Sequence, residues 1–193
     1  MEKNELSEKE SLKIIEGMIL KAKGNVVSNQ FYFIMWGWAI ALINLFVYFS
    51  QTLYEFPYAH FAWILCLPLG IYTGIHASIK AKMRPVKTHL EDMFSYMWLA
   101  FFVMVIIIAG AGPKIGFNIN PLIVLITGFP TFITGIAIKF KPLIYGGAAF
   151  WLFAVLGFAL PFEYHPLVGA AAIIVGYLVP GYLLKQKVKN ESL

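Results

Sequence analysis

The sequence predicts an all-α fold: a polytopic membrane bundle of six transmembrane helices, preceded by an amphipathic cytoplasmic helix. Three observations lead to this prediction. Of the 193 residues, 60% are hydrophobic and only 13% are charged, whereas a soluble domain has about 25% charged residues. Six long apolar runs contain no Asp, Glu, Lys or Arg. Their apolar residues do not alternate with polar ones, as they would in the strands of a membrane barrel.

The same composition excludes several classes of protein. The chain is too apolar to be a disordered protein or a coiled coil. A soluble enzyme of this length could not hide so much apolar surface in its core. Cys66 is the only cysteine, which excludes disulfides within the chain and metal clusters built on cysteine.

Residues 1–30 are expected to form a cytoplasmic segment that contains an amphipathic helix at 7–23. Ser7 and Glu10 fit a capping box at the start of this helix, and the apolar residues that follow recur at helical spacing. The helix would lie on lipid headgroups, or it would dock a protein partner or a second copy of the chain. The first apolar run begins only after this segment and is too long for the core of a signal peptide.

The membrane domain is expected to cover residues 31–184, followed by a cytoplasmic tail at 185–193. A helix of about 20 residues crosses the ~30 Å hydrocarbon core of a membrane, and each apolar run has about this length. The six predicted spans are 31–50, 59–79, 93–113, 118–138, 142–160 and 166–184.

Helix signals mark the ends of several spans. Thr88 and Glu91 form a capping box before the third span. Prolines suit the first helical turn, and they open the fourth, fifth and sixth spans at Pro121, Pro142 and Pro166. Further prolines fall inside the second, fourth and sixth spans, where each removes a backbone hydrogen bond and predicts a bend. These are Pro68, Pro130 and Pro180.

Positive charges predict the orientation of the chain. The two termini and the even-numbered connections hold 14 of the 15 Lys and Arg residues, and only Lys114 falls in an odd-numbered connection. Because positively charged loops stay in the cytoplasm, both termini are predicted to be cytoplasmic. The same residues would attract anionic lipid headgroups at the inner face, so the basic character of the chain does not require nucleic acid as a partner.

Internal repetition suggests that the six spans form three tandem helical hairpins. Trp36 and Trp98 are 62 residues apart, and a Thr-Gly-Ile string recurs at 73–75 and 134–136. A third copy around Trp151 would have a shorter spacing. Repeats of this kind are common in membrane transporters and other polytopic folds.

Small residues spaced four apart predict close helix packing in three spans, because they let backbones approach. These residues are Gly70, Gly74 and Ser78 in the second span, Thr127, Thr131 and Gly135 in the fourth, and Ala172 and Gly176 in the sixth. Alternatively, the same faces would line a narrow polar path through the membrane. The residues for such a path are Asn44, Thr73, His76, Thr131 and Thr134.

The outer loops contain two imidazoles and two carboxylates. Glu55 and His60 lie in the first outer loop, and Glu163 and His165 lie in the third. These four residues could bind Zn²⁺ or another divalent ion if the loops meet in space. The alternative is a set of ordinary interfacial residues within an aromatic belt. The spacing matches no specific ligand motif, so neither a metal nor a cofactor is assigned.

The spans lack the groups that active transport and catalysis require. They contain no carboxylate, Lys or Arg, whereas ion-coupled transporters and proton pumps usually need such residues within the membrane. His76 could gate or sense pH, or it could simply bond to a neighbouring helix. No hydrolase, zinc-protease or nucleotide-binding motif is present, and Asp92 is the only aspartate. The protein is therefore predicted to be non-enzymatic.

Four strings in the chain resemble those of an uncharacterised family of bacterial six-span inner-membrane proteins. They are Ser7-Glu8-Lys9-Glu10-Ser11-Leu12, Trp36-Gly37-Trp38, Phe140-Lys141-Pro142-Leu143 and Pro161-Phe162-Glu163-Tyr164. The resemblance covers nearly the whole chain and implies a bacterial inner-membrane location. The family has no assigned activity, so it implies no functional residues.

These observations predict a membrane protein that works by interaction, as a scaffold, sensor or accessory subunit. Its contact surface would be the helix at 7–23 together with the basic inner loop at 80–92, and it could form a homo-oligomer. The alternative function is a passive channel or facilitator for a small neutral solute.

Overall fold

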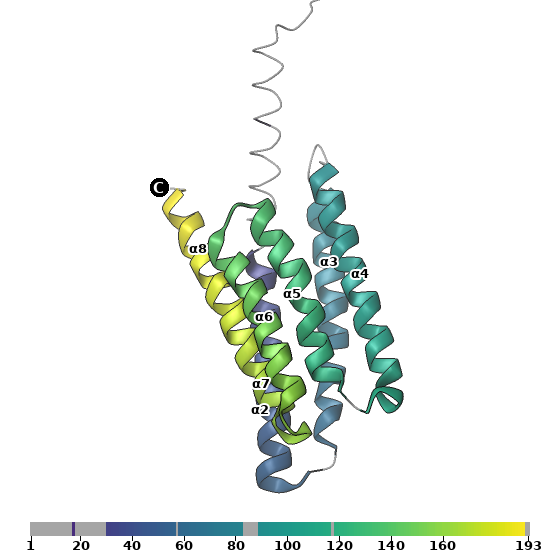
Figure 1. Cartoon of the computed structure of the whole chain (residues 1–193). Coiled ribbons are helices and arrows are strands. Elements are labelled where there is room, and N and C mark those ends of the chain that lie inside the picture. Colours follow the sequence, from purple (N-terminus) through teal and green to yellow (C-terminus); the bar gives the residue numbers. More distant parts are fainter. Residues whose placement is uncertain (1–16, 18–29, 57, 83–88, 117, 192–193) are drawn as a thin grey trace, which may run out of the picture.

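The computed structural model describes residues 17, 30–56, 58–82, 89–116 and 118–191 (Figure 1). No strand occurs among these residues. The predicted helix at 7–23, Gly17 apart, lies outside them, and so does the inner loop at 83–88. The helical elements are α2 (Gln30–Tyr54), η1 (Ala59–Leu65), α3 (Cys66–Lys82), α4 (His89–Ala111), η2 (Gly112–Ile115), α5 (Ile119–Ala137), α6 (Lys141–Ala159), η3 (Phe162–Tyr164), α7 (His165–Ile173), η4 (Ile174–Leu178) and α8 (Val179–Glu191).

Six helical stretches in the described residues are long and apolar enough to cross a membrane, which confirms the predicted number of spans. They run side by side along a common axis (Figure 1). Each overlaps one predicted apolar run. The six stretches are Phe31–Tyr54, Ala59–Lys80, Asp92–Ala111, Ile119–Ala137, Lys141–Ala159 and Phe162–Lys187.

The second span is not one continuous α-helix. It begins as the 3₁₀-helix η1 and becomes α-helical only at Cys66. Pro68 therefore lies in the first turn of α3 and not in the middle of a helix. A proline in a helix interior would lack its own hydrogen bond and would clash with the carbonyl four residues earlier. The change of helix type before Pro68 avoids both penalties.

The third span ends two residues earlier than predicted. Helix α4 stops at Ala111, and the 3₁₀ turn η2 follows, with Pro113 near its start. Gly116 closes this turn with a φ of 63°, a left-handed conformation that glycine adopts without a steric penalty. The chain then enters α5 at Ile119, with Pro121 in the first turn of the helix.

The sixth span is the longest and extends into the predicted tail. Helices α7, η4 and α8 follow one another without a break, and α8 continues to Glu191. The segment η4 is a π-helix that ends at Leu178, two residues before Pro180. A π-helix bonds each residue to the fifth along instead of the fourth, so the wider turn accommodates the proline without ending the helix.

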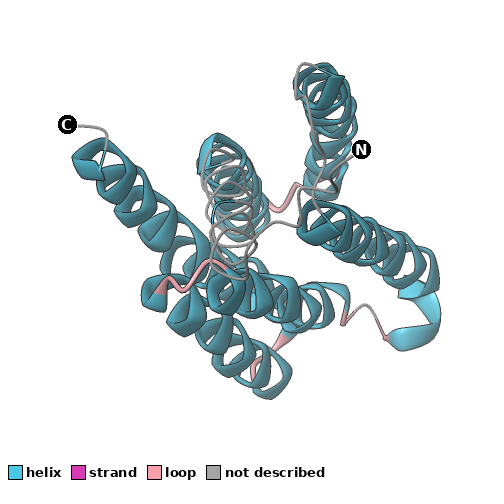
Figure 2. Cartoon of the chain, turned by 90° about the horizontal axis from the view of Figure 1, so that it is seen from above, coloured by secondary structure: helices cyan, strands magenta, loops and turns pink. Residues whose placement is uncertain are grey.

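A core of buried side chains joins α2, α5, α6 and the sixth span. Figure 2 shows this bundle from above. Phe150 of α6 is completely buried, and Leu143 and Ala172 are buried in the same cluster. On the facing side, the rings of Phe33 and Tyr177 lie 5.0 Å apart. These contacts connect helices from the two ends of the sequence.

Helices α3 and α4 lie at the edge of the bundle (Figure 1). Within the most apolar stretch of each, no residue is buried by the rest of the chain, whereas each of the other four spans has buried residues. Helix α4 still reaches the core through its aromatic side chains, because the Trp98 ring lies 6.3 Å from that of Phe33. The described residues therefore leave most of α3 and α4 uncovered.

The sequence-related positions of the suggested hairpins differ in their packing. Pro68 is exposed at the start of α3, whereas Pro130 is buried inside α5. An added Cβ at Gly74 would meet nothing within 4 Å, but one at Gly135 would lie 2.6 Å from the backbone nitrogen of Ile144. The helix pairs therefore do not pack as equivalent units.

Candidate functional site

The polar residues considered for a path through the membrane do not gather around one passage. Asn44, Thr131 and Thr134 lie in the core and are 2%, 0% and 1% exposed. The two core threonine hydroxyls donate to backbone carbonyls of their own helix, at 2.8 and 2.6 Å, which satisfies them locally. Thr73 also donates within its own helix, to the Gly70 carbonyl at 2.8 Å. It lies on the peripheral α3, apart from the other three.

Glycines bring α5 and α6 into backbone contact. An added Cβ at Gly147 would lie 2.6 Å from the Phe132 Cα, and one at Gly128 would lie 2.9 Å from the Gly147 carbonyl oxygen. Thr127, one of the predicted packing residues on α5, is buried beside this contact. Such close approach is what small residues allow between membrane helices.

The sixth span makes a second close contact with α6. Ala172 is completely buried, and an added Cβ at Gly176 would lie 2.7 Å from the ring of Phe150. Gly176 belongs to the π-helix η4. Gly146 and Gly176 face each other so closely that neither position has room for a side chain.

The small residues of α3 contact no other helix of the described chain. An added Cβ at Gly70 or Gly74 would meet nothing within 4 Å, and Gly74 and Ser78 are exposed. The pattern that predicts packing here is the same as in α5, yet within the chain α3 does not use it. Its small-residue face, Gly70, Gly74 and Ser78, remains open.

Contacts near the two ends of the second span attach it to α2. At one end, the Tyr32 hydroxyl shares a 2.6 Å hydrogen bond with His76 Nδ1, and the His76 ring stacks on Tyr72. At the other end, the Gln51 amide donates to His60 Nε2 at 2.7 Å. A small apolar cluster joins α2 and η1 beside that second bond. It consists of Ile43, Val47 and Ala59, with Ala62, Trp63 and Cys66 packed against it.

The first and third outer loops meet, as the metal hypothesis required, but their two imidazoles and two carboxylates do not all line one hollow. Glu55 and Glu163 line one open hollow of about 410 Å³ with Gln51 and Phe162. His60 is bonded to Gln51 and does not line the hollow. No three His, Cys, Asp or Glu side chains among the described residues lie close enough together to hold a metal ion.

His165 is buried at the start of α7 and does not line the hollow. It is only 3% exposed, and its Nε2 donates to the Leu160 carbonyl at 3.2 Å. Its ring packs edge-on against Phe162, with the centroids 5.4 Å apart. In the described part of the chain, His165 Nδ1 is the only buried side-chain nitrogen or oxygen without a hydrogen-bond partner. This residue therefore contributes to the packing of the outer end.

A polar junction of three helices was missed by the sequence reasoning. The Asn120 amide donates to Asn44 Oδ1 at 2.8 Å, and the Asn44 amide donates to the Ile40 carbonyl at 3.0 Å. Gly169 of α7 packs against both asparagines, because an added Cβ there would lie 2.6 Å from Asn120 Oδ1. Asn120 stands directly before Pro121, so the sequence predicts only that a helix starts there and does not indicate the contact with Asn44.

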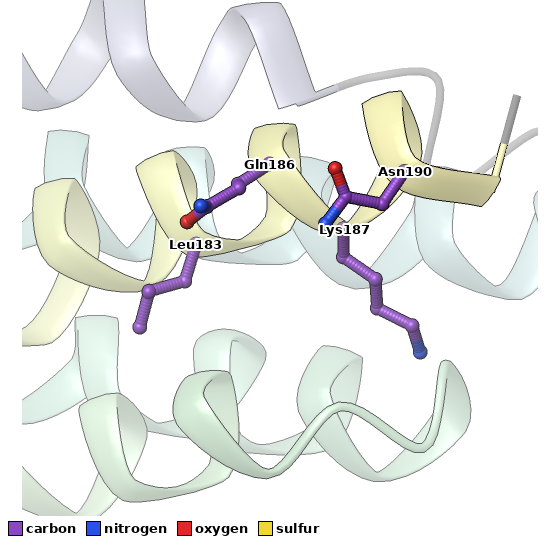
Figure 3. A pocket seen from close by; sticks show the side chains of 4 residues that line it. All are labelled: Leu183, Gln186, Lys187 and Asn190. Atoms are coloured by element: carbon purple, nitrogen blue, oxygen red, sulfur yellow. The ribbon is translucent and has the colours of Figure 1, made fainter. Parts of the chain in front are cut away.

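A second open hollow, also missed, lies on α8 at the end of the bundle that holds the α5–α6 turn. Its volume is about 390 Å³, and Leu183, Gln186, Lys187 and Asn190 line it (Figure 3).

Comparison of the chain with protein-family models, curated proteins and solved structures finds no match. The arrangement of the chain's own residues must therefore carry any functional conclusion.

Proposed function

We propose that the chain is a non-enzymatic integral membrane protein that acts by contact with another membrane protein, as a scaffold, sensor or accessory subunit. The observation that supports this most directly is the uncovered state of α3 and α4. We further propose that both termini lie in the cytoplasm, because almost all basic residues fall in the termini and the even-numbered connections. The bacterial inner membrane is the location that the family resemblance implies.

The surface of α3 suits a protein neighbour better than lipid. Lipid tails require no particular side-chain size, whereas small residues are enriched where two membrane helices meet. Gly70 and Gly74 are open to the surroundings, and Gly70, Gly74 and Ser78 follow one another at the interval of a helix interface. A helix of another chain could approach this face to backbone distance.

The position of α3 and α4 in the sequence connects this face to the cytoplasmic surface. The two helices flank the inner loop, which carries Lys80, Lys82, Arg84 and Lys87. A partner that packs on α3 would therefore also meet this basic loop. The helix at 7–23 would form the third part of the same contact surface.

The placement of the polar residues does not favour a passive facilitator. Such a protein needs a continuous polar lining that opens at least to one side of the membrane. Asn44, Thr131 and Thr134 are closed off in the core, and Thr73 and His76 lie on the peripheral α3.

Replacement of Gly74 by leucine tests the proposal. The variant keeps the fold, because the site is open, but it should prevent close approach of another helix. A matched control is Gly110→Leu on α4, because Gly110 is equally open but has no small residue four positions away. The measurement is the mass of the protein extracted in mild detergent, with co-purified proteins identified by mass spectrometry.

The wild type and Gly110→Leu should give a complex heavier than the monomer, and Gly74→Leu should give the monomer. Deletion of residues 1–24 should also weaken the complex. A wild-type protein that is monomeric without partners, or a Gly74→Leu variant with an unchanged complex, would contradict the proposal.

A further inference from the structure

One face of α8 carries a hollow whose lining is polar at one end and apolar at the other. Leu183, Gln186, Lys187 and Asn190 line it. Their spacing puts them on the same side of the helix, as Figure 3 shows. Gln186, Lys187 and Asn190 supply amide and ammonium N–H donors. Leu183 supplies an exposed apolar side chain.

The depth of this hollow follows from the position of Lys187. Its Nζ lies 5.8 Å from the centre of the Phe140 ring, a distance at which the ammonium is attracted to the ring face. Phe140 immediately precedes the fifth span, Lys141–Ala159. Lys187 is thus held at the level where the spans leave the hydrocarbon core. Leu183 lies one helical turn deeper, about 6 Å at 1.5 Å per residue.

The charge around the hollow is positive. Lys139 and Lys141, at the turn between α5 and α6, lie at the same end of the bundle as Lys185, Lys187 and Lys189. From residue 139 to the end of α8 the acidic residues are Glu163, which lies in the outer loop at the opposite end, and Glu191, the last residue of α8. The five lysines outnumber Glu191 at this end of the four helices. An anion in the hollow meets Lys187 and the N–H donors of Gln186 and Asn190, beside the apolar Leu183.

We propose that the hollow on α8 binds the headgroup of one anionic phospholipid. Lys187 would hold the phosphate, Asn190 and Gln186 would donate hydrogen bonds to it, and an acyl chain would descend past Leu183. The site differs from general attraction between lysines and a charged membrane, because a specific set of side chains on one helix face forms it. The proposal stands independently of any protein partner.

A titration of the delipidated full-length protein in detergent, followed by native mass spectrometry, tests this site. The probes are phosphatidylglycerol and phosphatidylcholine with identical acyl chains. The wild type should bind the first phosphatidylglycerol more tightly than phosphatidylcholine. Lys187→Gln should weaken that binding about five-fold, because one lysine near an anionic membrane surface contributes about 1 kcal/mol to binding. Lys187→Arg should keep most of the wild-type affinity.

The matched control is Lys185→Gln, which removes the same charge from the same helix at a residue outside the lining. It should leave the first binding event almost unchanged. Asn190→Ala provides a second test within the hollow and should weaken binding two- to three-fold. Equal effects of Lys185→Gln and Lys187→Gln would overturn the proposal in favour of diffuse attraction. Equal binding of the two lipids, or displacement of phosphatidylglycerol by millimolar glycerol phosphate, would overturn the assignment to a lipid headgroup.

Discussion

Replacement of Gly147 by alanine should destabilise the bundle, because this position is where α5 and α6 meet most closely. The added Cβ would lie 2.6 Å from the N, Cα and Cβ atoms of Phe132. Real Cβ contacts are rarely shorter than 3.4 Å, so the two helices would have to separate by up to about 0.8 Å. The atoms met include backbone, which cannot rotate away as the end of a side chain can.

The expected cost is about 2 kcal/mol. Overpacking of a well-packed core costs about 1–3 kcal/mol, and a backbone contact places this variant at the upper end of that range. Alanine regains about 1 kcal/mol because it favours the helix more than glycine does. Gly74→Ala is the matched control. It gains the same helix preference, and its Cβ meets nothing within 4 Å, so its free energy of unfolding should stay equal or rise by up to about 1 kcal/mol.

The assay is equilibrium unfolding of the purified protein in mixed micelles, with increasing amounts of a denaturing detergent and tryptophan fluorescence as the readout. Trp151 lies beside the α5–α6 contact, 5.2 Å from the Phe132 ring, and should report its separation. Equal free energies of unfolding for Gly147→Ala and Gly74→Ala would refute the close contact between α5 and α6.

Three further predictions address the core. In a double-mutant cycle, Asn44→Ala and Asn120→Ala should each lower the free energy of unfolding by about 1 kcal/mol. The double variant should lose less than the sum of these two costs, because the two residues share one hydrogen bond. Additive costs would contradict this hydrogen bond. Phe150→Ala should cost about 3–5 kcal/mol in the same unfolding assay, because the ring is completely buried, whereas Leu152→Ala, at a 75% exposed residue, should cost well below 1 kcal/mol. Liposomes with the reconstituted protein should take up small neutral solutes no faster than empty liposomes, since Asn44 and the core threonines are closed off; faster uptake would revive the facilitator hypothesis.

The number of spans could be predicted from the sequence because charge position alone determines it. A long run without charged residues crosses the membrane as a helix, because a helix pairs its own backbone N–H and C=O groups by hydrogen bonds. The limits of the helices were harder to predict. Whether Pro68 bends a helix or begins one depends on the preceding turn, and no residue between 59 and 65 marks that turn as a 3₁₀-helix.

Packing partners could not be predicted in the same way. Gly74 and Gly135 stand in the same Thr-Gly-Ile string, yet one is open and the other touches a neighbouring backbone. The string specifies that a helix can approach, but the arrangement of the other helices decides whether one does. The same limit explains the outer loops, where His165 is buried against Leu160 and Phe162 while Glu55 and Glu163 line a hollow.

The hollow on α8 was missed for a related reason. The lysines that follow the apolar run predict a separate tail at residues 185–193. In the structure, α8 continues through this boundary to Glu191. Only this continuity aligns Leu183 with Lys187 and Asn190 on one face.

The most direct test is whether a polypeptide covers α3 in the native membrane. A photo-crosslinking residue placed at Gly74 is compared with one at Leu152, an exposed residue on α6. Irradiation of intact membranes should produce a protein adduct from position 74 and only lipid adducts from position 152. The mass of that adduct distinguishes a second copy of the chain from a different partner. Lipid adducts alone at both positions would show that α3 simply faces the membrane and would contradict the proposed role as an interaction protein.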